Sequence, residues 1–541
     1  MRTIAHRAGA MAALAAIALL AGCETQPDHA FDRALGSTAV APAPAGPSPA
    51  RARAQGLFAA PALPPLARNR ESYQPIDSNP VRLAAEHPVS TFGVDVDTGS
   101  YSNVRRFLNA GTMPPADAVR VEELVNYFDY GYARPADAGT PFAVTTEVAR
   151  TPWNPDSFLL QIGIKGYDID RADRPAANLV FLVDVSGSMQ ARDKLPLVVQ
   201  SLKMLTDQLT ARDRIAVVTY AGRAGTVLEP TPGDRKAEIR AALDGLQAGG
   251  GTAGGAGLKR AYELAERARI DGGVNRVLLA TDGDFNVGVS DVGQLRELIA
   301  AKRRTGITLT TLGFGTGNYQ EALMEQIADV GNGNYAYIDG LAEARKVLVN
   351  EMSSTLFTIA QDVKVQVEFN PAKVAEYRLI GFENRVLKRA DFNNDRVDAG
   401  DIGAGHTVTA LYEIVPAGGR GSVDPLRYGT TGPAAVSPDA AEFAFLKLRY
   451  KLPGQDRSRL IEQPLAASLL EGSGSIEASA DLRFAAAVAA FGQILRGGEH
   501  TGGFDYGDVL ELARGARGDD PLGYRAGFLT LVDLARGLQG S

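Results

Sequence analysis

Three short, oxygen-bearing side chains follow one apolar run of the sequence. The run "NLVFLVDV" contains Asp184 near its end, and Ser186 and Ser188 follow at alternate positions. Two further stretches have a similar layout: Thr252 stands among glycines in "GGGTAGGAGL", and Asp282 follows the apolar residues of "LLATDGDFN". In open α/β sheets, the loops at the carboxyl ends of the strands converge on one crevice. We therefore expect these five side chains to surround one point.

The five side chains supply only oxygen atoms. Three hydroxyls and two carboxylates, without a thiolate or an imidazole, suit a hard divalent cation, Mg²⁺ first and then Mn²⁺ or Ca²⁺, and disfavour zinc. Mg²⁺ prefers about six oxygens and keeps several waters, so hydroxyls next to the ion and carboxylates behind them leave one position open. An Asp or Glu carboxylate of a partner could fill that position. The glycines around Thr252 allow a close backbone approach and movement of the loop.

Each of these motifs also has a purely structural explanation. Ser188 and Thr252 could be helix N-caps, and Asp184 could accept a hydrogen bond from a loop amide. For one motif alone this explanation would be preferred, but the convergence of three motifs at strand ends of one predicted sheet favours the metal site. A further acidic stretch, "FGVDVDTGS", carries Asp95 and Asp97. This pair of carboxylates resembles the aspartate motif of phosphotransferases, but no partner Lys motif follows at a recognisable place. A solvated turn is therefore the preferred interpretation.

The motifs need a parallel sheet to bring them together. From residue 176 to 357, strand-like apolar runs alternate with helical patterns, which predicts a doubly wound, mainly parallel sheet. The fold class expected for the chain is therefore α/β with smaller flanking regions. A small N-terminal α/β domain is expected at 81–137, and strands that could complete a sandwich at 138–175. A β-rich domain is expected at 358–480 and a helical C-terminal region at 481–541.

The motifs and their order resemble those of a known family. "DVSGS", the Gly-flanked Thr252 and "TDG" look like the elements of the metal-ion-dependent adhesion site (MIDAS) of von Willebrand factor type A (vWA) domains, whose fold is a doubly wound sheet. The resemblance implies that Ser186 and Ser188 bind the metal directly. It also implies that Thr252 binds directly in an open state and through water in a closed one, while Asp184 and Asp282 act mainly through water. The outer segments "STFGVDVDTGSYSNVRRFL" and "DAGDIGAGHTVTALYEI" resemble the flanking domains of bacterial vWA lipoproteins.

The N-terminus has the features of an export signal. In residues 1–22, Arg2 and Arg7 precede an apolar stretch that is too short to span a bilayer. Cys23 is the only Cys of the chain and follows Leu-Ala-Gly, which resembles the lipobox of bacterial lipoproteins and implies lipidation of its thiol. Glu24 after it implies the outer membrane, and the Pro- and Ala-rich stretch 23–80 is expected to be a disordered tether. We therefore expect a lipid-anchored protein of the bacterial cell envelope.

Charge and the placement of histidines disfavour several classes of function. The formal net charge is −7, which argues against nucleic acid as a partner. The five His residues stand at positions 6, 29, 87, 406 and 500, outside the predicted α/β domain, so the serines lack a base for nucleophilic catalysis. No Walker A loop is present, and no small-molecule cofactor is expected.

These observations favour a tethered binding protein over an enzyme. The preferred hypothesis is a metal-dependent adhesion or scaffold protein that captures a protein partner through an Asp or Glu carboxylate. One alternative is a metal-dependent hydrolase in which Asp282 acts as the base. The other is a purely structural protein of the envelope that uses the metal for stability.

Overall fold

The computed structural model describes most of the chain that follows the N-terminal stretch. The described residues are 71–94, 96–135, 139–170, 172–251, 254–283, 292–424, 441–472 and 478–540. The predicted signal peptide, Cys23, Asp95 and Thr252 lie outside these ranges. Within the same ranges, no helix combines the length and the apolar character needed to cross a lipid bilayer.

A six-stranded sheet forms the centre of the α/β domain. Its strand order is β10-β9-β8-β5-β6-β7, and every neighbouring pair is parallel except β6 and β7. This confirms the doubly wound, mainly parallel sheet that the sequence predicted. In sheet order the strands are β10 (Tyr335–Ile338), β9 (Ile307–Phe314), β8 (Val274–Thr281), β5 (Ala177–Asp184), β6 (Arg214–Tyr220) and β7 (Ala224–Pro232).

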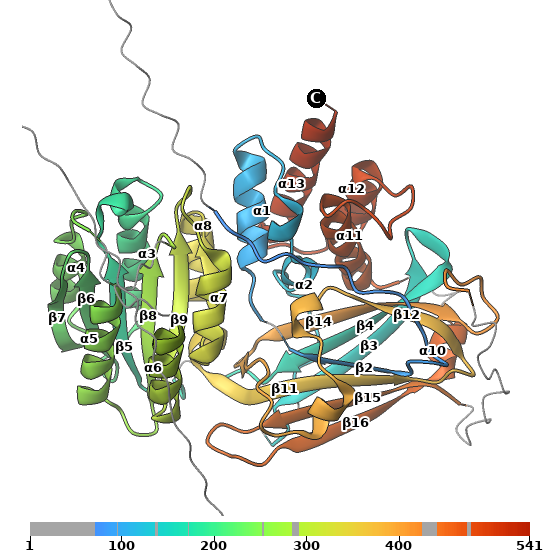
Figure 1. Ribbon diagram of the computed structural model, residues 1–541, viewed down its shortest axis with the longest axis horizontal. Helices are drawn as coiled ribbons and strands as arrows, with labels where there is room; N and C mark the ends of the chain where they lie inside the picture. Colours follow the sequence, from blue (N-terminus) through green and yellow to red (C-terminus); the bar gives the residue numbers. More distant parts are fainter. Residues whose placement is uncertain are drawn as a thin grey trace, which may run out of the picture. The chain divides into compact units, whose positions relative to one another are not determined.

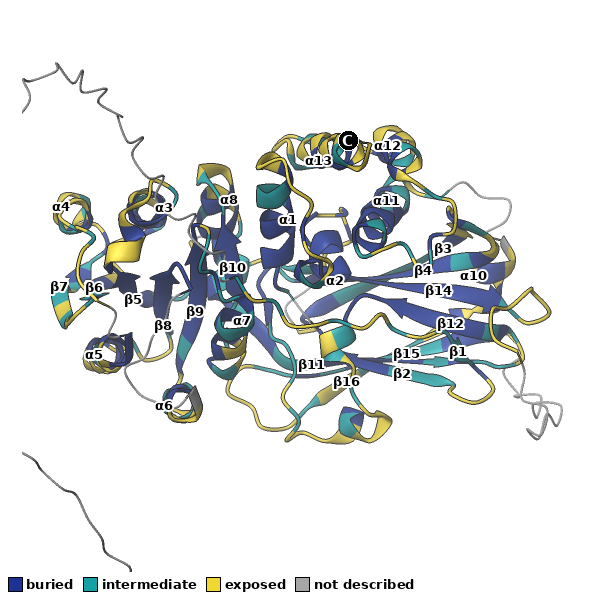
Figure 2. Cartoon of the chain, turned by 45° about the horizontal axis from the view of Figure 1, so that its top comes forward, coloured by how far each residue is buried: buried dark blue, intermediate teal, exposed yellow. Residues whose placement is uncertain are grey.

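Helices cover both faces of this sheet, and its central strands are buried (Figure 2). Alternate residues of β5 point to opposite faces: Leu179, Phe181 and Val183 join the core on one face, and Val180 and Leu182 join the core on the other. All five are fully buried, which explains the uninterrupted apolar run in the sequence. The first face carries α3 (Leu195–Gln208), α4 (Lys236–Asp244) and α8 (Leu341–Arg345), and the second carries α5 (Gly254–Arg267), α6 (Val292–Arg304) and α7 (Glu321–Val330).

Two antiparallel sheets pack face to face as a sandwich. One has the order β1-β12-β14-β4-β3, and the other has the order β13-β11-β15-β16 with β2 paired to β11. The rings of Phe369 and Tyr377 stack between the two sheets, with centroids 4.3 Å apart. Strands β3 and β4 precede the α/β domain in sequence yet share a sheet with β12 and β14, which follow it. The α/β domain is therefore an insertion between strands of one sandwich.

The strands of the sandwich have the following bounds. The first sheet contains β1 (Arg82–Leu83), β12 (Val374–Ile380), β14 (Thr407–Pro416), β4 (Asn154–Gly166) and β3 (Phe142–Thr151). The second sheet contains β13 (Ile402–Gly403), β11 (Thr358–Phe369), β15 (Glu442–Lys451), β16 (Arg459–Ala466) and β2 (Val89–Gly93).

The segment 81–137 does not form a separate domain, which corrects the prediction made for it. Its strands β1 and β2 each extend one sheet of the sandwich, and its helices pack with the C-terminal helices (Figure 1). The ring of Phe128 contacts those of Phe484 and Phe528, with centroids 5.1 and 5.9 Å away. The helices concerned are α1 (Gly99–Asn109), α2 (Val121–Val125), α11 (Ala480–Leu495), α12 (Tyr506–Gly515) and α13 (Tyr524–Gln539). Two further short helices lie elsewhere in the chain, α9 (Met352–Leu356) and α10 (Ala467–Gly472).

Residues 71–80, predicted as the end of the disordered tether, contact the folded chain. Glu71 pairs with Arg106 of α1 at 2.9 Å and accepts a hydrogen bond from the Gly317 amide at 2.9 Å. The amide of Ser72 donates to the carbonyl of Tyr319 at 3.2 Å. The residues that follow the N-terminal stretch are thus bonded to the loop between β9 and α7.

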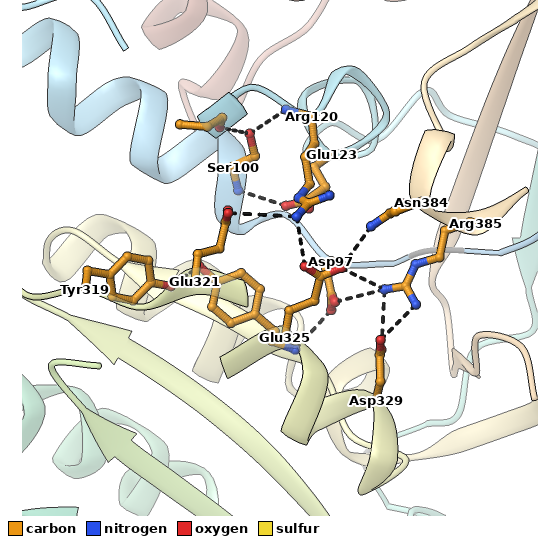
Figure 3. Close-up of polar contacts among 12 residues, drawn as sticks. Asp97, Ser100, Arg120, Glu123, Tyr319, Glu321, Glu325, Asp329, Asn384 and Arg385 are labelled. Carbon is orange, nitrogen blue, oxygen red and sulfur yellow. Dashed lines mark hydrogen bonds and ion pairs between the residues drawn. The ribbon is translucent and has the colours of Figure 1, made fainter. Parts of the chain in front are cut away.

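A buried ionic cluster joins α7 to the segment before α2 (Figure 3). Arg120, whose side chain is 1% exposed, lies 3.0 Å from a carboxylate oxygen of Glu325, 3.3 Å from Glu123 and 3.9 Å from Glu321. We call these four residues the Arg120 cluster. Beside it, Asp97 is buried and accepts a hydrogen bond from the Tyr335 amide at 3.0 Å, so the prediction of a solvated turn at Asp97 was wrong.

Candidate metal centre

Four of the five predicted site residues lie at the carboxyl edge of the six-stranded sheet. Asp184 is the last residue of β5, and Asp282 directly follows β8, which is its parallel neighbour. Ser186 and Ser188 lie in the loop after β5, and their hydroxyl oxygens are 3.0 Å apart. Ser188 also hydrogen-bonds the carboxylate of Asp282. The side chains that the sequence assigned to one point are therefore neighbours, with Thr252 still to be considered.

The glycine loop that leads to Thr252 approaches the same place. Thr252 itself lies outside the described residues. The amide of Gly187 donates to the carbonyl of Gly250 at 3.1 Å, and the amide of Gly249 donates to the carbonyl of Val185 at 2.8 Å. Gly250 has a φ of +88°, a conformation that glycine adopts without a steric penalty. These bonds bring the backbone before Thr252 against the serine loop, while the position of its hydroxyl stays a prediction.

Asp184 is fully buried and is held by three donors. One carboxylate oxygen accepts the Ser186 amide at 2.8 Å, and the other accepts the hydroxyls of Tyr220 and Thr281, each at 3.1 Å. Burial raises the pKa of Asp184, the hydrogen bonds from Ser186 oppose this, and the nearby charge of Asp282 adds to it. Tyr220 ends β6 and Thr281 ends β8, the two strands that flank β5. A single hydroxyl at the end of a strand is too common to have identified either residue from the sequence.

The N-cap explanation does not fit the serines. Helix α3 begins at Leu195, its N-cap is Lys194, and its first turn has no side-chain cap bond. The short helical turn Gly187–Gln190 has Ser186 at its N-cap position, again without a side-chain cap bond. The Ser186 and Ser188 hydroxyls face each other instead, as two ligands of one ion would. The loop-amide explanation does hold for Asp184, and it is compatible with a role behind the metal.

A lysine that the sequence analysis did not identify also enters the site. The ammonium of Lys194 donates to a carboxylate oxygen of Asp282 at 2.9 Å and to the side-chain oxygen of Asn318 at 3.1 Å. Asp282 is fully buried, and burial would raise its pKa; the hydrogen bonds from Lys194 and Ser188 prevail and lower it. Lys194 precedes a helix in a polar stretch, where a solvent-exposed lysine would be the ordinary expectation.

The donor set fits a hard dication. Two neutral hydroxyls stand side by side, two buried carboxylates lie behind them, and no soft ligand is present among the described residues of the site. Because only two members are carboxylates, the site is not a cluster of three or more His, Cys, Asp or Glu side chains; no such cluster occurs in the part of the chain that the structure describes. Ser186 and Ser188 would hold the ion, and it would supply a Lewis-acidic position for an incoming anionic ligand.

Comparison with sequence families separates the α/β domain from the segments on either side of it. Residues 178–350 match the family described as von Willebrand factor type A domain, and residues 67–161 match one described as von Willebrand factor. Residues 354–538 match the family described as Uncharacterized protein YfbK, C-terminal. The Uncharacterized protein YfbK of Escherichia coli (strain K12) is 50% identical over 472 residues, which cover 86% of this chain and 81% of that protein.

Solved structures with similar folds include a von Willebrand factor type A protein from Catenulispora acidiphila. It is 17% identical with a TM-score of 0.41, and the match covers 72% of this chain and 89% of that one. Another is proximal thread matrix protein 1 from the mussel byssus, in a structure with a zinc-occupied MIDAS motif. That protein is 24% identical with a TM-score of 0.27, over 35% of this chain and 46% of that one.

Proposed function

Because this chain belongs to the family of the uncharacterized YfbK protein of Escherichia coli and contains a von Willebrand factor type A domain, we propose that it is a divalent-metal-dependent binding protein. Its site would ligate an Asp or Glu carboxylate of a partner protein through a bound cation, with Mg²⁺ as the ion. Domains of the vWA family commonly mediate metal-dependent protein interactions.

The observation that carries this proposal is the pairing of neutral hydroxyls with buried carboxylates. The Ser186 and Ser188 hydroxyls are 3.0 Å apart, while Asp184 is turned to backbone and hydroxyl donors and Asp282 to Lys194. Neutral inner ligands leave much of the charge of a dication unbalanced, which favours an anionic ligand from outside. Ser188 is exposed, so the site is open to such a ligand.

A groove beside the site offers further contact area. It has a volume of about 400 Å³ and runs between α3 and the end of α4. Its lining begins at Met189 and Gln190, which directly follow Ser188, and includes Val199 and Leu246. Residues that flank an acidic side chain of the partner would lie over this groove.

The surroundings of the serines support binding over catalysis. His87, His406 and His500 are the histidines that the structure describes, and none of them belongs to the α/β domain. The Ser186 and Ser188 hydroxyls bond each other, and neither bonds one of the described histidines, which would be the usual base for a serine nucleophile. We therefore propose no enzymatic activity. We also propose that Cys23 carries a lipid anchor that holds the protein at the cell envelope, in the outer membrane.

An affinity capture tests the proposal. The immobilised protein is exposed to an envelope extract in Mg²⁺ and in EDTA, alongside Ser186→Ala and a control, Ser201→Ala. Ser201 is a buried serine of α3 whose hydroxyl bonds the Leu197 carbonyl, so the control removes a hydroxyl outside the site. We expect one set of partners to be retained by the wild type and the control in Mg²⁺, and to be lost in EDTA and with Ser186→Ala.

Two outcomes would contradict the proposal. Equal recovery of every protein in all four arms would mean that capture does not involve the metal site. A Ser186→Ala variant that unfolds at a lower temperature but captures the same partners as the wild type would support the structural alternative, in which the metal only stabilises the fold.

A further inference from the structure

Lys194 carries a positive charge into the candidate metal site. Its ammonium lies 2.9 Å from the Asp282 carboxylate and 3.1 Å from the Asn318 side-chain oxygen, and its side chain is 9% exposed. The carboxylate that it bonds is itself a predicted site residue and is hydrogen-bonded by Ser188. The ammonium and the predicted metal position therefore compete for the charge of Asp282.

The chain holds this lysine in place on two sides. The Lys194 carbonyl accepts a hydrogen bond from the amide of Val198. Its backbone is therefore fixed at the N-cap position of α3. Its methylene chain lies over Gly315, at a point where a Cβ atom would collide with it. Gly315 has a φ of +75°, which also disfavours any other residue there. The approach of Lys194 thus depends on a glycine in the neighbouring loop.

The charges of the site sum differently with and without Lys194. Asp184 and Asp282 oppose a single ammonium, so these three side chains carry one net negative charge. A bound dication would turn this sum into one net positive charge, and without the ammonium the same site would be neutral. A positive sum attracts a carboxylate from a partner more strongly than a neutral sum does. The ammonium also repels the dication itself.

We propose that Lys194 is a built-in counter-cation of the metal site: it weakens binding of the dication and strengthens binding of the carboxylate that follows. This inference rests on the proposed function and assigns Lys194 as its positioning and specificity-determining residue. In the metal-free chain Lys194 neutralises Asp282. In the metal-bound chain it preserves the positive charge that selects an acidic partner.

The test compares Lys194→Met with a matched control, Lys203→Met. Methionine keeps most of the methylene chain over Gly315 and removes the charge. Lys203 also lies on α3 but bonds Asp244 at the surface, so its replacement removes the same charge away from the site. Mn²⁺ binding is measured by electron paramagnetic resonance, and acetate is then titrated into the Mn²⁺-loaded protein and followed by water-proton relaxation.

We expect opposite effects on the two ligands. Lys194→Met should bind Mn²⁺ about tenfold more tightly than the wild type and acetate about tenfold more weakly, because one nearby charge has been removed. Lys203→Met should match the wild type in both measurements. Lys194→Gln provides a second neutral side chain, and it should reproduce both effects if they arise from charge.

The outcomes separate this inference from the proposed function. If the wild type binds Mn²⁺ and both neutral variants bind Mn²⁺ and acetate with unchanged affinity, the role of Lys194 is overturned and the proposed function stands. If the wild type binds no Mn²⁺ but Lys194→Met does, the ammonium takes the place of the metal, and both are overturned. If no variant binds Mn²⁺, the proposed function fails and the role of Lys194 fails with it.

Discussion

Replacement of Asp184 by Asn is expected to weaken Mg²⁺ binding by about 10- to 100-fold, the usual cost of losing a partner behind the metal ligands. Asn keeps the shape of the side chain and can still accept a hydrogen bond from the Ser186 amide, but it removes one of the two negative charges of the site. The Tyr220 and Thr281 hydroxyls can rotate to accept bonds from the new amide group. The fold should therefore survive while affinity falls.

Isothermal titration calorimetry with Mg²⁺ measures this change. Asp244→Asn is the matched control, because Asp244 ends α4 on the surface of the same domain and its loss changes the net charge equally. The control should bind Mg²⁺ as the wild type does. If Asp184→Asn binds Mg²⁺ as tightly as the control, Asp184 does not belong to a metal site.

Loss of the cation of the Arg120 cluster should strongly destabilise the fold (Figure 3). Arg120→Met should lower the free energy of unfolding by about 3 to 5 kcal/mol, because Glu123 and Glu321 would stay buried without their cation and Glu325 would keep only Arg385, 3.3 Å away. Urea unfolding followed by circular dichroism gives this value. Arg134→Met is the control: its side chain is 73% exposed in a pair with Asp168, and its loss should cost no more than about 1 kcal/mol.

The loss of unfolding free energy caused by Arg120→Met should depend on pH. Burial raises the pKa of Glu321 to about 8, and the charge of Arg120 opposes this rise. The folded chain therefore holds this proton more tightly than the unfolded chain, so stability falls as the pH rises from about 4.5 to 8. Without Arg120 the pKa of Glu321 should rise further and the fall should continue to higher pH, so the loss of stability in Arg120→Met should be smaller at pH 5 than at pH 8. An equal loss of unfolding free energy at both pH values, or a loss no larger than that of Arg134→Met, would contradict the role assigned to the Arg120 cluster.

The sequence predicted the α/β domain because its signals are local. The run ending at Asp184 is apolar on both faces of a buried strand, and the loops at the carboxyl ends of parallel strands converge, so this rule was enough to expect Asp184 near Asp282. The serines follow within four residues and could not lie far away. The proximity of these residues could therefore be predicted from chain connectivity and from the general rules of open sheets.

The remaining features depend on contacts between distant segments. Nothing near Arg120 in the sequence indicates that Glu321 and Glu325, about two hundred residues later, would surround it. Lys194 enters the metal site only because Gly315, in another loop, leaves room for its methylene chain. The segment 81–137 was predicted as a domain since its helices are amphipathic, but the apolar faces that they cover belong to the C-terminal helices and to the sandwich.

One hard cation should bind between the loops after β5 and β8. Anomalous diffraction from crystals grown with Mn²⁺ can locate this ion. We expect a single strong peak bonded to the hydroxyls of Ser186 and Ser188 at about 2 to 2.5 Å, with Thr252 and both carboxylates around it. A peak elsewhere on the molecule, or no peak within bonding distance of the two serine hydroxyls at saturating Mn²⁺, would show that these loops do not form the metal site.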